Sequence, residues 1–211
     1  MTLSVICCLP REYKYVLILQ GILLLTACSG KPLLSSLSTN ARIVAFGDSL
    51  TYGTGVSSEQ SYPSVLQSLI GRTVIRSGVP GEISNKGLAR LDSVLAREQP
   101  DLVIVCHGGN DILRRMNGAQ TEANLRAMVS KVRTSGAEVI LLAVPRLGLF
   151  PEAPGYYERI AEDMQVPIEM DVLADLEGDS SMKSDQVHFN AAGYRKMALA
   201  VQQLLIDAGA I

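Results

Sequence analysis

A serine, a histidine and an aspartate of this chain have the types and spacing needed for nucleophilic catalysis at an acyl group. Ser49 lies in the segment Gly47-Asp48-Ser49-Leu50, and Asp185 precedes His188 by three positions. A serine hydroxyl is a poor nucleophile unless a base takes its proton and a third group holds that base in the right tautomer. His188 is the natural base for Ser49, and Asp185 can reach Nδ1 of His188 from the same loop. These three residues form the predicted catalytic group.

The negative charge that develops on an acyl oxygen during this chemistry needs fixed hydrogen-bond donors, called an oxyanion hole. Three donors are available in separate segments: the backbone N–H groups of Ser49 and Gly81, and the side-chain amide of Asn110. Because Gly81 has no side chain, a substrate can approach its N–H closely. We therefore predict an oxyanion hole built from Ser49, Gly81 and Asn110.

The remaining polar residues near these segments are predicted to support the site and not to react. Asp48 is interpreted as a turn-former, and Asp111 as a brace for the loop that presents Asn110. His107 directly follows an apolar run and precedes two glycines, which favours a structural or rim role over catalysis. Since the chain has only two histidines, a zinc site of the HExxH or Cys/His kind has too few candidate ligands. We predict no metal and no cofactor.

Short apolar runs alternate with helical periodicity along the rest of the chain, which indicates the elements that position these residues. One helix face is predicted around Leu91, another around Leu125, and a final helix is predicted to begin after Asn190 as N-cap. Wholly apolar strands separated by helices are typical of a parallel sheet covered on both faces. We predict an α/β fold, a three-layer α/β/α sandwich with a central sheet of about five strands. The expected strands are Arg42–Phe46, Thr73–Arg76, Leu102–Cys106, Val139–Val144 and Val166–Met170.

The candidate residues follow these strands directly, where functional residues of parallel sheets gather. In order along the chain, the segments around Ser49, Gly81, Asn110 and His188 resemble the four sequence blocks of the SGNH (GDSL) hydrolase family. The stretch from Gly81 to Leu91 (GEISNKGLARL) is similar to the branch of thioesterases, lysophospholipases and arylesterases. The resemblance covers residues 42–205.

The resemblance implies a flavodoxin-like SGNH hydrolase fold over residues 42–211. It also implies that Ser49 is the nucleophile, His188 the base and Asp185 the residue that orients His188, with the same three oxyanion donors. The chain departs from the family pattern beside the histidine, where Gln186 replaces a glycine and Phe189 replaces a proline. We expect these changes to affect the loop and the rim of the pocket more than the chemistry.

The segment after the fourth predicted strand, Leu147-Gly148-Leu149-Phe150-Pro151, is apolar where a surface loop is normally polar. Either it packs back on the core, or Leu147, Leu149 and Phe150 line an acyl pocket beside Ser49. The resembling branch has a substrate groove beside the corresponding loop, which favours the second interpretation.

The N-terminus has the pattern of an exported, lipid-anchored bacterial protein. The apolar run from Tyr15 to Ala27 follows Arg11 and Lys14, and it is shorter than the about 20 residues that a membrane-spanning helix needs. It ends in Leu25-Thr26-Ala27-Cys28, which resembles a lipobox. We predict a signal peptide over residues 1–27 and a tether over residues 28–41 that carries lipid on Cys28. The alternative is a buried apolar helix with an incidental cysteine. Ser29 favours the outer membrane, on its periplasmic side, if the host is Gram-negative.

Composition and charge reduce the number of functions that the sequence allows. Lys and Arg number 19, Asp and Glu number 21, and no basic block is present, so binding to nucleic acid through its phosphates is not expected. The leading prediction is a serine esterase acting on small acyl esters, arylesterase- or lysophospholipase-like. The export signal makes acyl-CoA an unlikely natural substrate. The alternatives are a carbohydrate O-acetylesterase of the cell envelope, or a catalytically silent binding lipoprotein on the same fold.

Overall fold

The computed structural model describes residues 33–211, and these form an α/β domain around one parallel sheet. The predicted signal peptide (1–27) and Cys28 lie outside the described residues. Across residues 33–211, no helix combines the length and the apolar character needed to cross a membrane.

Five parallel strands lie in the order β2-β1-β3-β4-β5, which confirms the predicted sheet. The strands are β1 (Arg42–Gly47), β2 (Thr73–Gly78), β3 (Leu102–Cys106), β4 (Glu138–Leu142) and β5 (Ile168–Glu169). β3 is buried at all of its positions, as expected for a strand with helices on both faces.

The last strand is shorter than its apolar pattern predicts. The predicted run Val166–Met170 contributes only Ile168 and Glu169 to the sheet. Pro167 has no N–H to donate to the ladder, although its carbonyl accepts a hydrogen bond from the Leu141 amide. β5 is therefore a short edge strand.

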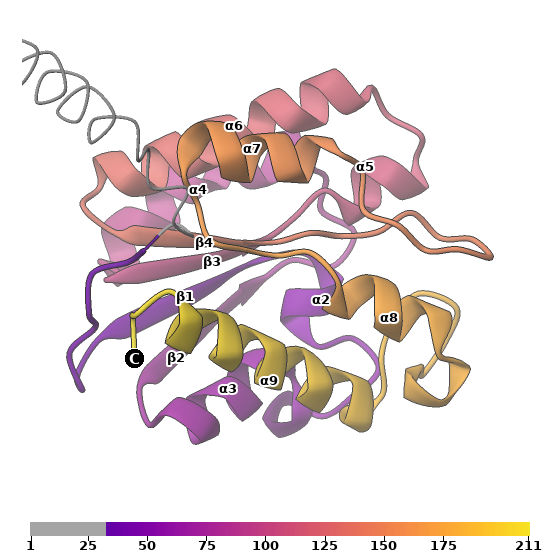
Figure 1. Cartoon of the computed structure of the whole chain (residues 1–211), viewed down its shortest axis with the longest axis horizontal. Helices are drawn as coiled ribbons and strands as arrows, with labels where there is room; N and C mark the ends of the chain where they lie inside the picture. The colour runs from indigo at the N-terminus through magenta and orange to yellow at the C-terminus, as the bar shows by residue number, and fades with distance from the viewer. Residues whose placement is uncertain (1–32) are drawn as a thin grey trace, which may run out of the picture. The chain divides into compact units, whose positions relative to one another are not determined.

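Helices cover both faces of the sheet, which gives the predicted three layers (Figure 1). One face carries α3 (Tyr62–Ile70), α8 (Val172–Gly178) and α9 (Ala191–Asp207), and the other carries α4 (Ser84–Glu98), α6 (Gly118–Thr134) and α7 (Tyr156–Met164). Two short helices, α2 (Ser49–Tyr52) and α5 (Gly109–Leu113), follow β1 and β3 directly. Two 3₁₀ turns cover Ser58–Gln60 and Ser180–Met182.

Periodic apolar residues account for how the long helices pack. α6 buries Leu125, Met128, Val129 and Val132 against the sheet, on the face that the spacing predicts. Asn190 is the N-cap of α9, and its side chain accepts hydrogen bonds from the Ala192 and Gly193 amides.

The order of the strands reverses at β1. The chain passes from β1 to β2 on one side, and then returns to place β3 on the other side of β1. Such a reversal opens a crevice at the carboxyl ends of the strands, where open α/β sheets bind ligands. Ser49 follows β1 and Asn110 follows β3, so both lie at this point.

Two glycines at strand ends let the chain pack closely there. A Cβ built on Gly47 would lie 2.2 Å from the carbonyl oxygen of Cys106, and one on Gly78 would lie 2.2 Å from the Tyr52 nitrogen. A side chain at Gly47 would push β3 away from β1, and one at Gly78 would push α2 away from β2. These close approaches therefore help to set the position of Ser49, the first residue of α2.

Candidate active site

Ser49 begins α2 immediately after β1, and Asp48 caps this helix. The Asp48 carboxylate accepts a hydrogen bond from the Leu50 amide at 3.1 Å, as an N-cap residue does. Because Ser49 is the first residue of the helix, its own N–H has no partner within the helix. Asp48 is therefore held as part of the turn, which agrees with its interpretation as a turn-former.

His188 and Asp185 meet Ser49 from the loop between α8 and α9. His188 Nε2 lies 2.9 Å from Ser49 Oγ, and His188 Nδ1 lies 2.8 Å from Asp185 Oδ2. Ser49 is 139 positions away from His188 in sequence, so only the fold brings the two together. With Nδ1–H donated to Asp185, Nε2 is left to accept the serine proton. The three predicted catalytic residues thus form a continuous hydrogen-bonded chain.

The Asp185 carboxylate is held in its ionised form. Partial burial acts to raise its pKa, but hydrogen bonds from the Val187 amide, the His188 ring and the His188 amide outweigh this effect and lower the pKa to about 2. Asp185 Oδ1 accepts both backbone bonds, at 2.7 and 2.8 Å, which leaves Oδ2 for the imidazole. Asp185 therefore remains a hydrogen-bond acceptor for His188 at any pH of practical use.

The three predicted oxyanion donors follow β1, β2 and β3: Ser49 begins α2, Gly81 lies in the loop after β2, and Asn110 lies in α5. Asn110 Nδ2 donates one hydrogen bond to Asp48 Oδ2 at 3.0 Å, and an amide nitrogen has a second hydrogen to offer. Gly81 has a φ of +76°, a conformation that favours glycine, and its carbonyl accepts a hydrogen bond from Arg114 at 2.8 Å. Asp48, which is buried, thus connects the turn of Ser49 to the side chain of Asn110.

Asp111 braces the loop of Asn110 against the start of α4. Its carboxylate accepts hydrogen bonds from the Ser84 amide at 2.8 Å, from the Ser84 hydroxyl at 2.5 Å and from Thr121 at 3.3 Å. Asp111 is only 2% exposed. Its oxygens face these donors, as the sequence interpretation of a bracing residue requires.

A buried charged cluster behind Gly81 was not identified from the sequence. Glu82 receives hydrogen bonds from Arg90 Nε to both carboxylate oxygens, each at 2.8 Å, and lies 3.1 Å from His107 Nε2. Burial acts to raise the pKa of Glu82, but the hydrogen bonds from His107 and Arg90 prevail and lower it. The guanidinium of Arg90 also donates to the carbonyls of Gly47 and Ser77, and it lies over the Phe46 ring at 4.0 Å. The cluster therefore connects the ends of β1 and β2 to the residue beside Gly81.

His107 belongs to this cluster and lies inside the protein, with no exposed surface. Its Nδ1 accepts the Gly108 amide at 3.2 Å, which leaves Nε2–H to donate to Glu82. The rim position considered from the sequence is therefore wrong for His107, and the structural one remains. The sequence signal that could have found this position is a glycine inside α4, because a Cβ on Gly87 would lie 2.2 Å from His107 Nε2.

We expect the exchange His107→Ala to lower stability and to affect turnover far less than His188→Ala. It removes a buried donor from Glu82 and leaves a cavity, at a cost of about 2–4 kcal/mol in the free energy of unfolding. Urea unfolding and ester turnover of the two variants measure both effects. A greater loss of turnover with His107→Ala than with His188→Ala would overturn the choice of base.

Of the three residues predicted to line an acyl pocket, Leu147 borders a cavity beside the α5 region. This cavity, of about 540 Å³, is lined by the α5 region, including Ile112 and Met116, and by Leu147 and Tyr156. Leu149 and Phe150 are instead 87% and 86% exposed and do not line it. The acyl pocket formed by all three side chains stays a prediction.

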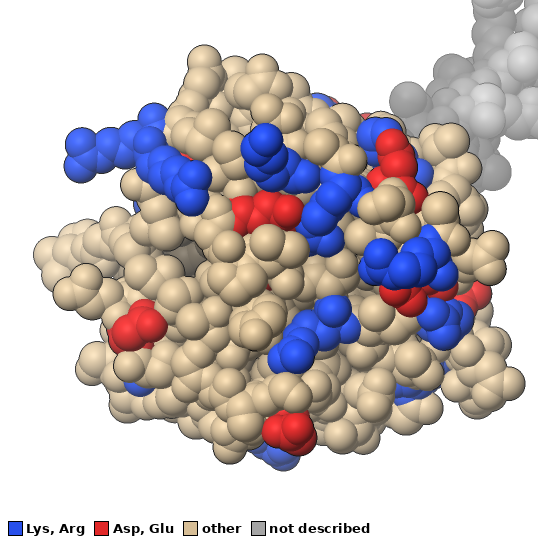
Figure 2. Space-filling model, turned by 180° about the vertical axis from the view of Figure 1, so that it is seen from behind, with Lys and Arg blue, Asp and Glu red and all other residues tan. Residues whose placement is uncertain are grey.

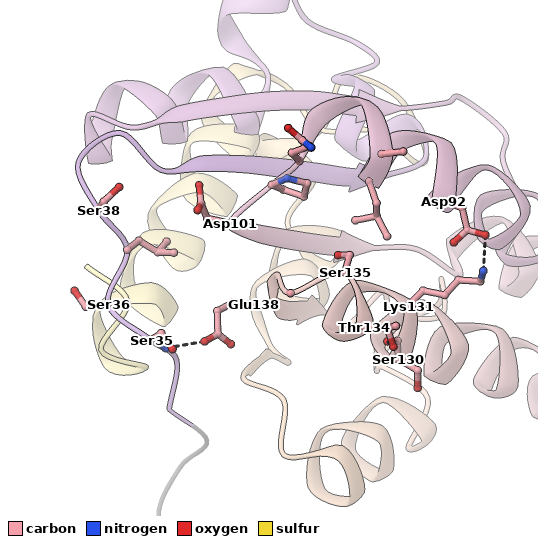
Figure 3. Close-up of a pocket in the computed structure, with 16 residues that line it drawn as sticks. Ser35, Ser36, Ser38, Asp92, Asp101, Ser130, Lys131, Thr134, Ser135 and Glu138 are labelled. Atoms are coloured by element: carbon pink, nitrogen blue, oxygen red, sulfur yellow. Dashed lines mark hydrogen bonds and ion pairs between the residues drawn. The ribbon is translucent and has the colours of Figure 1, made fainter.

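Another cavity, of about 980 Å³, lies away from Ser49 (Figure 3). Its lining includes Asp101 and Glu138, which stand at the amino ends of β3 and β4, and Ser35, whose amide donates to Glu138. The candidate catalytic residues follow the carboxyl ends of the strands. This cavity is therefore at the opposite edge of the sheet and belongs to no part of the candidate active site.

The arrangement at the carboxyl edge is that of a hydrolase that works through a serine. A serine hydroxyl in contact with an oriented imidazole can attack an ester carbonyl, and nearby N–H donors can stabilise the resulting oxyanion. Groups of three or more His, Cys, Asp or Glu side chains suited to a metal ion do not occur among residues 33–211. The fold and this site together define a serine hydrolase with a Ser-His-Asp arrangement on a parallel sheet of an α/β domain.

Comparison with known proteins agrees with this class. Residues 45–196 match the GDSL-like Lipase/Acylhydrolase family. The chain is 31% identical over 198 residues to Esterase TesA of Pseudomonas aeruginosa, covering 88% of this chain and 94% of that protein. It is 33% identical over 134 residues to thioesterase 1/protease 1/lysophospholipase L1 of Escherichia coli, covering 60% of this chain and 64% of that protein.

A crystal structure of TesA superposes with a TM-score of 0.73 at 29% identity, covering 79% of this chain and 99% of that one. The chain belongs to the GDSL-like lipase/acylhydrolase family, and it is an esterase of that family.

Proposed function

We propose that this esterase hydrolyses lipid-derived acyl esters, such as lysophospholipids, at the carboxyl edge of its sheet. Ser49 is the nucleophile in this proposal, and His188, oriented by Asp185, takes the hydroxyl proton and returns it to the leaving alcohol. The contact of 2.9 Å between Ser49 Oγ and His188 Nε2 carries the assignment. Ser49 N–H, Gly81 N–H and the Asn110 amide hold the oxyanion. Water, activated by the same imidazole, then releases the acyl group as a carboxylate.

Two observations and the predicted lipid anchor support a lipid-derived substrate. The cavity beside the α5 region has an apolar wall that includes Ile112, Leu113 and Met116. The E. coli relative carries lysophospholipase in its name, and the Vibrio mimicus relative, 34% identical over 137 residues, is named arylesterase. An anchored enzyme would also meet lipids in the membrane that holds it.

The proposed function is tested on a panel of esters with Ser49→Ala as the blank. The panel contains nitrophenyl esters of graded chain length, lysophosphatidylcholine and an acetylated glycan. We expect hydrolysis of lysophosphatidylcholine and of medium-chain esters with kcat/KM above that for acetyl esters, since each buried methylene contributes about 0.8 kcal/mol. Preference for the acetylated glycan would contradict the proposal and favour a carbohydrate O-acetylesterase. No turnover on any ester, with no labelling of Ser49 by a fluorophosphonate, would favour a silent binding protein.

We further propose that the protein is an exported lipoprotein held at the periplasmic side of the cell envelope through Cys28. The apolar run before Cys28 and the tether after it support this proposal. We expect the mature protein to begin at Cys28 with acyl chains attached and to fractionate with membranes. Cys28→Ala is expected to accumulate as an unprocessed precursor. Mass spectrometry of the N-terminal peptide decides, and an unmodified N-terminus at Ser29 or beyond would contradict the lipoprotein assignment.

Lowering the pH is expected to reduce kcat/KM, because a protonated His188 cannot accept the proton of Ser49. Asp185, with a pKa of about 2, stays ionised throughout this range, so it does not produce the loss. Burial raises the pKa of Asp48, which makes it the other carboxylate of the site to test. Rates measured in a pH-stat for the wild type and for Asp48→Asn distinguish the two groups. An acid loss that disappears in Asp48→Asn would contradict the assignment to His188, whereas a midpoint that only moves fits it, because the Asp48 charge interacts with His188.

A further inference from the structure

Two loops beside the candidate active site carry exposed apolar side chains that have no partner in the core. One loop joins β4 to α7 and projects from the domain as the orange hairpin at the right of Figure 1, held by the backbone bridge between Arg146 and Glu152. The other begins at Leu113, the last residue of α5, and continues to Met116. The exposed apolar residues of these loops are Leu113, Met116, Leu147, Leu149 and Phe150, with exposed fractions between 41% and 87%. Leu113, Met116 and Leu147 line one cavity, so the two loops lie side by side.

Three arginines stand among these apolar side chains: Arg114, Arg115 and Arg146 are all exposed. Arg115 and Arg146 line the same cavity as Leu147. Figure 2, turned by 180°, shows basic side chains projecting from this edge at the upper left. The hairpin contains one exposed acid, Glu152, which forms the backbone bridge with Arg146. The arginines therefore outnumber the exposed acids in these two loops. The five apolar residues and the three arginines are called the mouth surface below.

The mouth surface borders the candidate active site. α5 begins with Gly109 and Asn110 and ends at Leu113 of the mouth surface, and Arg114, Arg115 and Met116 follow it directly. Arg114 donates a hydrogen bond to the carbonyl of Gly81, an oxyanion residue. Whatever covers the mouth surface is therefore brought to the edge where Ser49 lies.

We propose that the mouth surface binds an anionic lipid bilayer, with Leu149 and Phe150 inserted among the acyl chains and the arginines against the lipid phosphates. Apolar side chains flanked by basic ones are the pattern with which a protein surface lies in a charged membrane interface. This inference rests on the proposed function, for which it supplies the physical form of the substrate: an ester presented from a membrane.

A second copy of the chain fits this surface less well. The usual pairing of two identical chains sets the same patch against itself, which here brings the arginines of both copies together. Like charges brought together in this way oppose association, whereas lipid phosphates attract each arginine.

Sedimentation with lipid vesicles tests the proposal. The protein used is the chain 29–211, since it contains the whole core that the described residues form, from Leu34 onward, and the apolar segment before Cys28 would bind vesicles by itself. We expect it to bind vesicles of phosphatidylcholine with phosphatidylglycerol more tightly than vesicles of phosphatidylcholine alone. We also expect binding to weaken as salt is raised.

Two double variants remove the two components of the surface. Leu149→Ser with Phe150→Ser is expected to lower the partition coefficient about tenfold or more. Arg115→Gln with Arg146→Gln is expected to lower it by about fivefold per charge on anionic vesicles, and to have little effect on neutral ones. The matched apolar control lies on α9, where Leu199→Ser with Ile206→Ser removes two apolar side chains of 42% and 47% exposure. The matched charge control is Arg97→Gln with Arg195→Gln, which removes one exposed charge from α4 and one from α9. The controls are expected to bind as the wild type does.

Hydrolysis of a soluble nitrophenyl acetate, measured on the same samples, separates this inference from the proposed function. We expect the double variant Leu149→Ser with Phe150→Ser, called the loop variant below, to hydrolyse it as the wild type does. The inference is wrong if the loop variant binds anionic vesicles as the wild type does, or if the binding of the wild type does not depend on lipid charge. A shift in chain-length preference with vesicle binding unchanged would assign Leu149 and Phe150 to the acyl pocket instead. If the wild type self-associates without binding vesicles, and the loop variant does not self-associate, the mouth surface would be a dimer surface. Absence of ester turnover in the wild type, with vesicle binding intact, would contradict only the proposed function.

Discussion

Exchange of Ser49 or His188 for alanine is expected to lower ester turnover at least about 10⁴-fold while the domain stays folded. The hydroxyl and imidazole act as one unit across a contact of 2.9 Å, so neither group retains its function without the other. Ser49→Ala leaves the turn intact, because Asp48 caps α2 through the backbone amide of Leu50 and not through the Ser49 hydroxyl. Initial rates on a nitrophenyl ester, together with thermal melting, measure activity and folding separately.

The double variant is the sharper experiment. Since the two residues form one unit, we expect Ser49→Ala combined with His188→Ala to be no slower than either single variant. His107→Ala is the matched control, since it removes the chain's other histidine from a buried position. Losses that multiply in the double variant would mean that His188 acts elsewhere than on Ser49.

The strands and the candidate residues were predictable because each depends on a local pattern. The run Leu102–Cys106 is apolar throughout and forms β3 with the predicted bounds. Parallel strands bring their carboxyl ends to one edge, so residues that follow different strands meet there. The contact between Asp185 and His188 is local in sequence. The fold then places their loop at this edge, where the imidazole of His188 reaches Ser49.

The buried cluster was not predictable in the same way. Glu82, Arg90 and His107 come from a loop, a helix and a strand end, and no periodicity marks them as partners. The apolar loop after β4 shows a second limit of prediction from sequence. Its composition indicated that Leu149 and Phe150 need an apolar partner, but not whether the partner belongs to the protein. Their exposed fractions, 87% and 86%, show that the described chain does not supply it.

The second large effect is expected at Asn110. Asn110→Ala keeps the contact between Ser49 and His188 but removes one oxyanion donor, and we expect kcat to fall by about 10²–10³. KM is expected to change little, because the hydrogen bond strengthens as charge develops on the carbonyl oxygen in the transition state. Steady-state kinetics on one nitrophenyl ester separate the two parameters.

Asp48 complicates this experiment, because Asn110→Ala also removes the hydrogen bond to Asp48 Oδ2. Burial of Asp48 makes its charge costly without a partner. Asp48→Asn is therefore the matched control: it changes the same contact and leaves Asn110 in place. If Asp48→Asn lost as much kcat as Asn110→Ala, the effect would come from displacement of the α2 turn. A small loss in Asp48→Asn beside a large loss in Asn110→Ala assigns the effect to the Asn110 amide itself, since that amide is then the one group of the pair that meets the developing oxyanion.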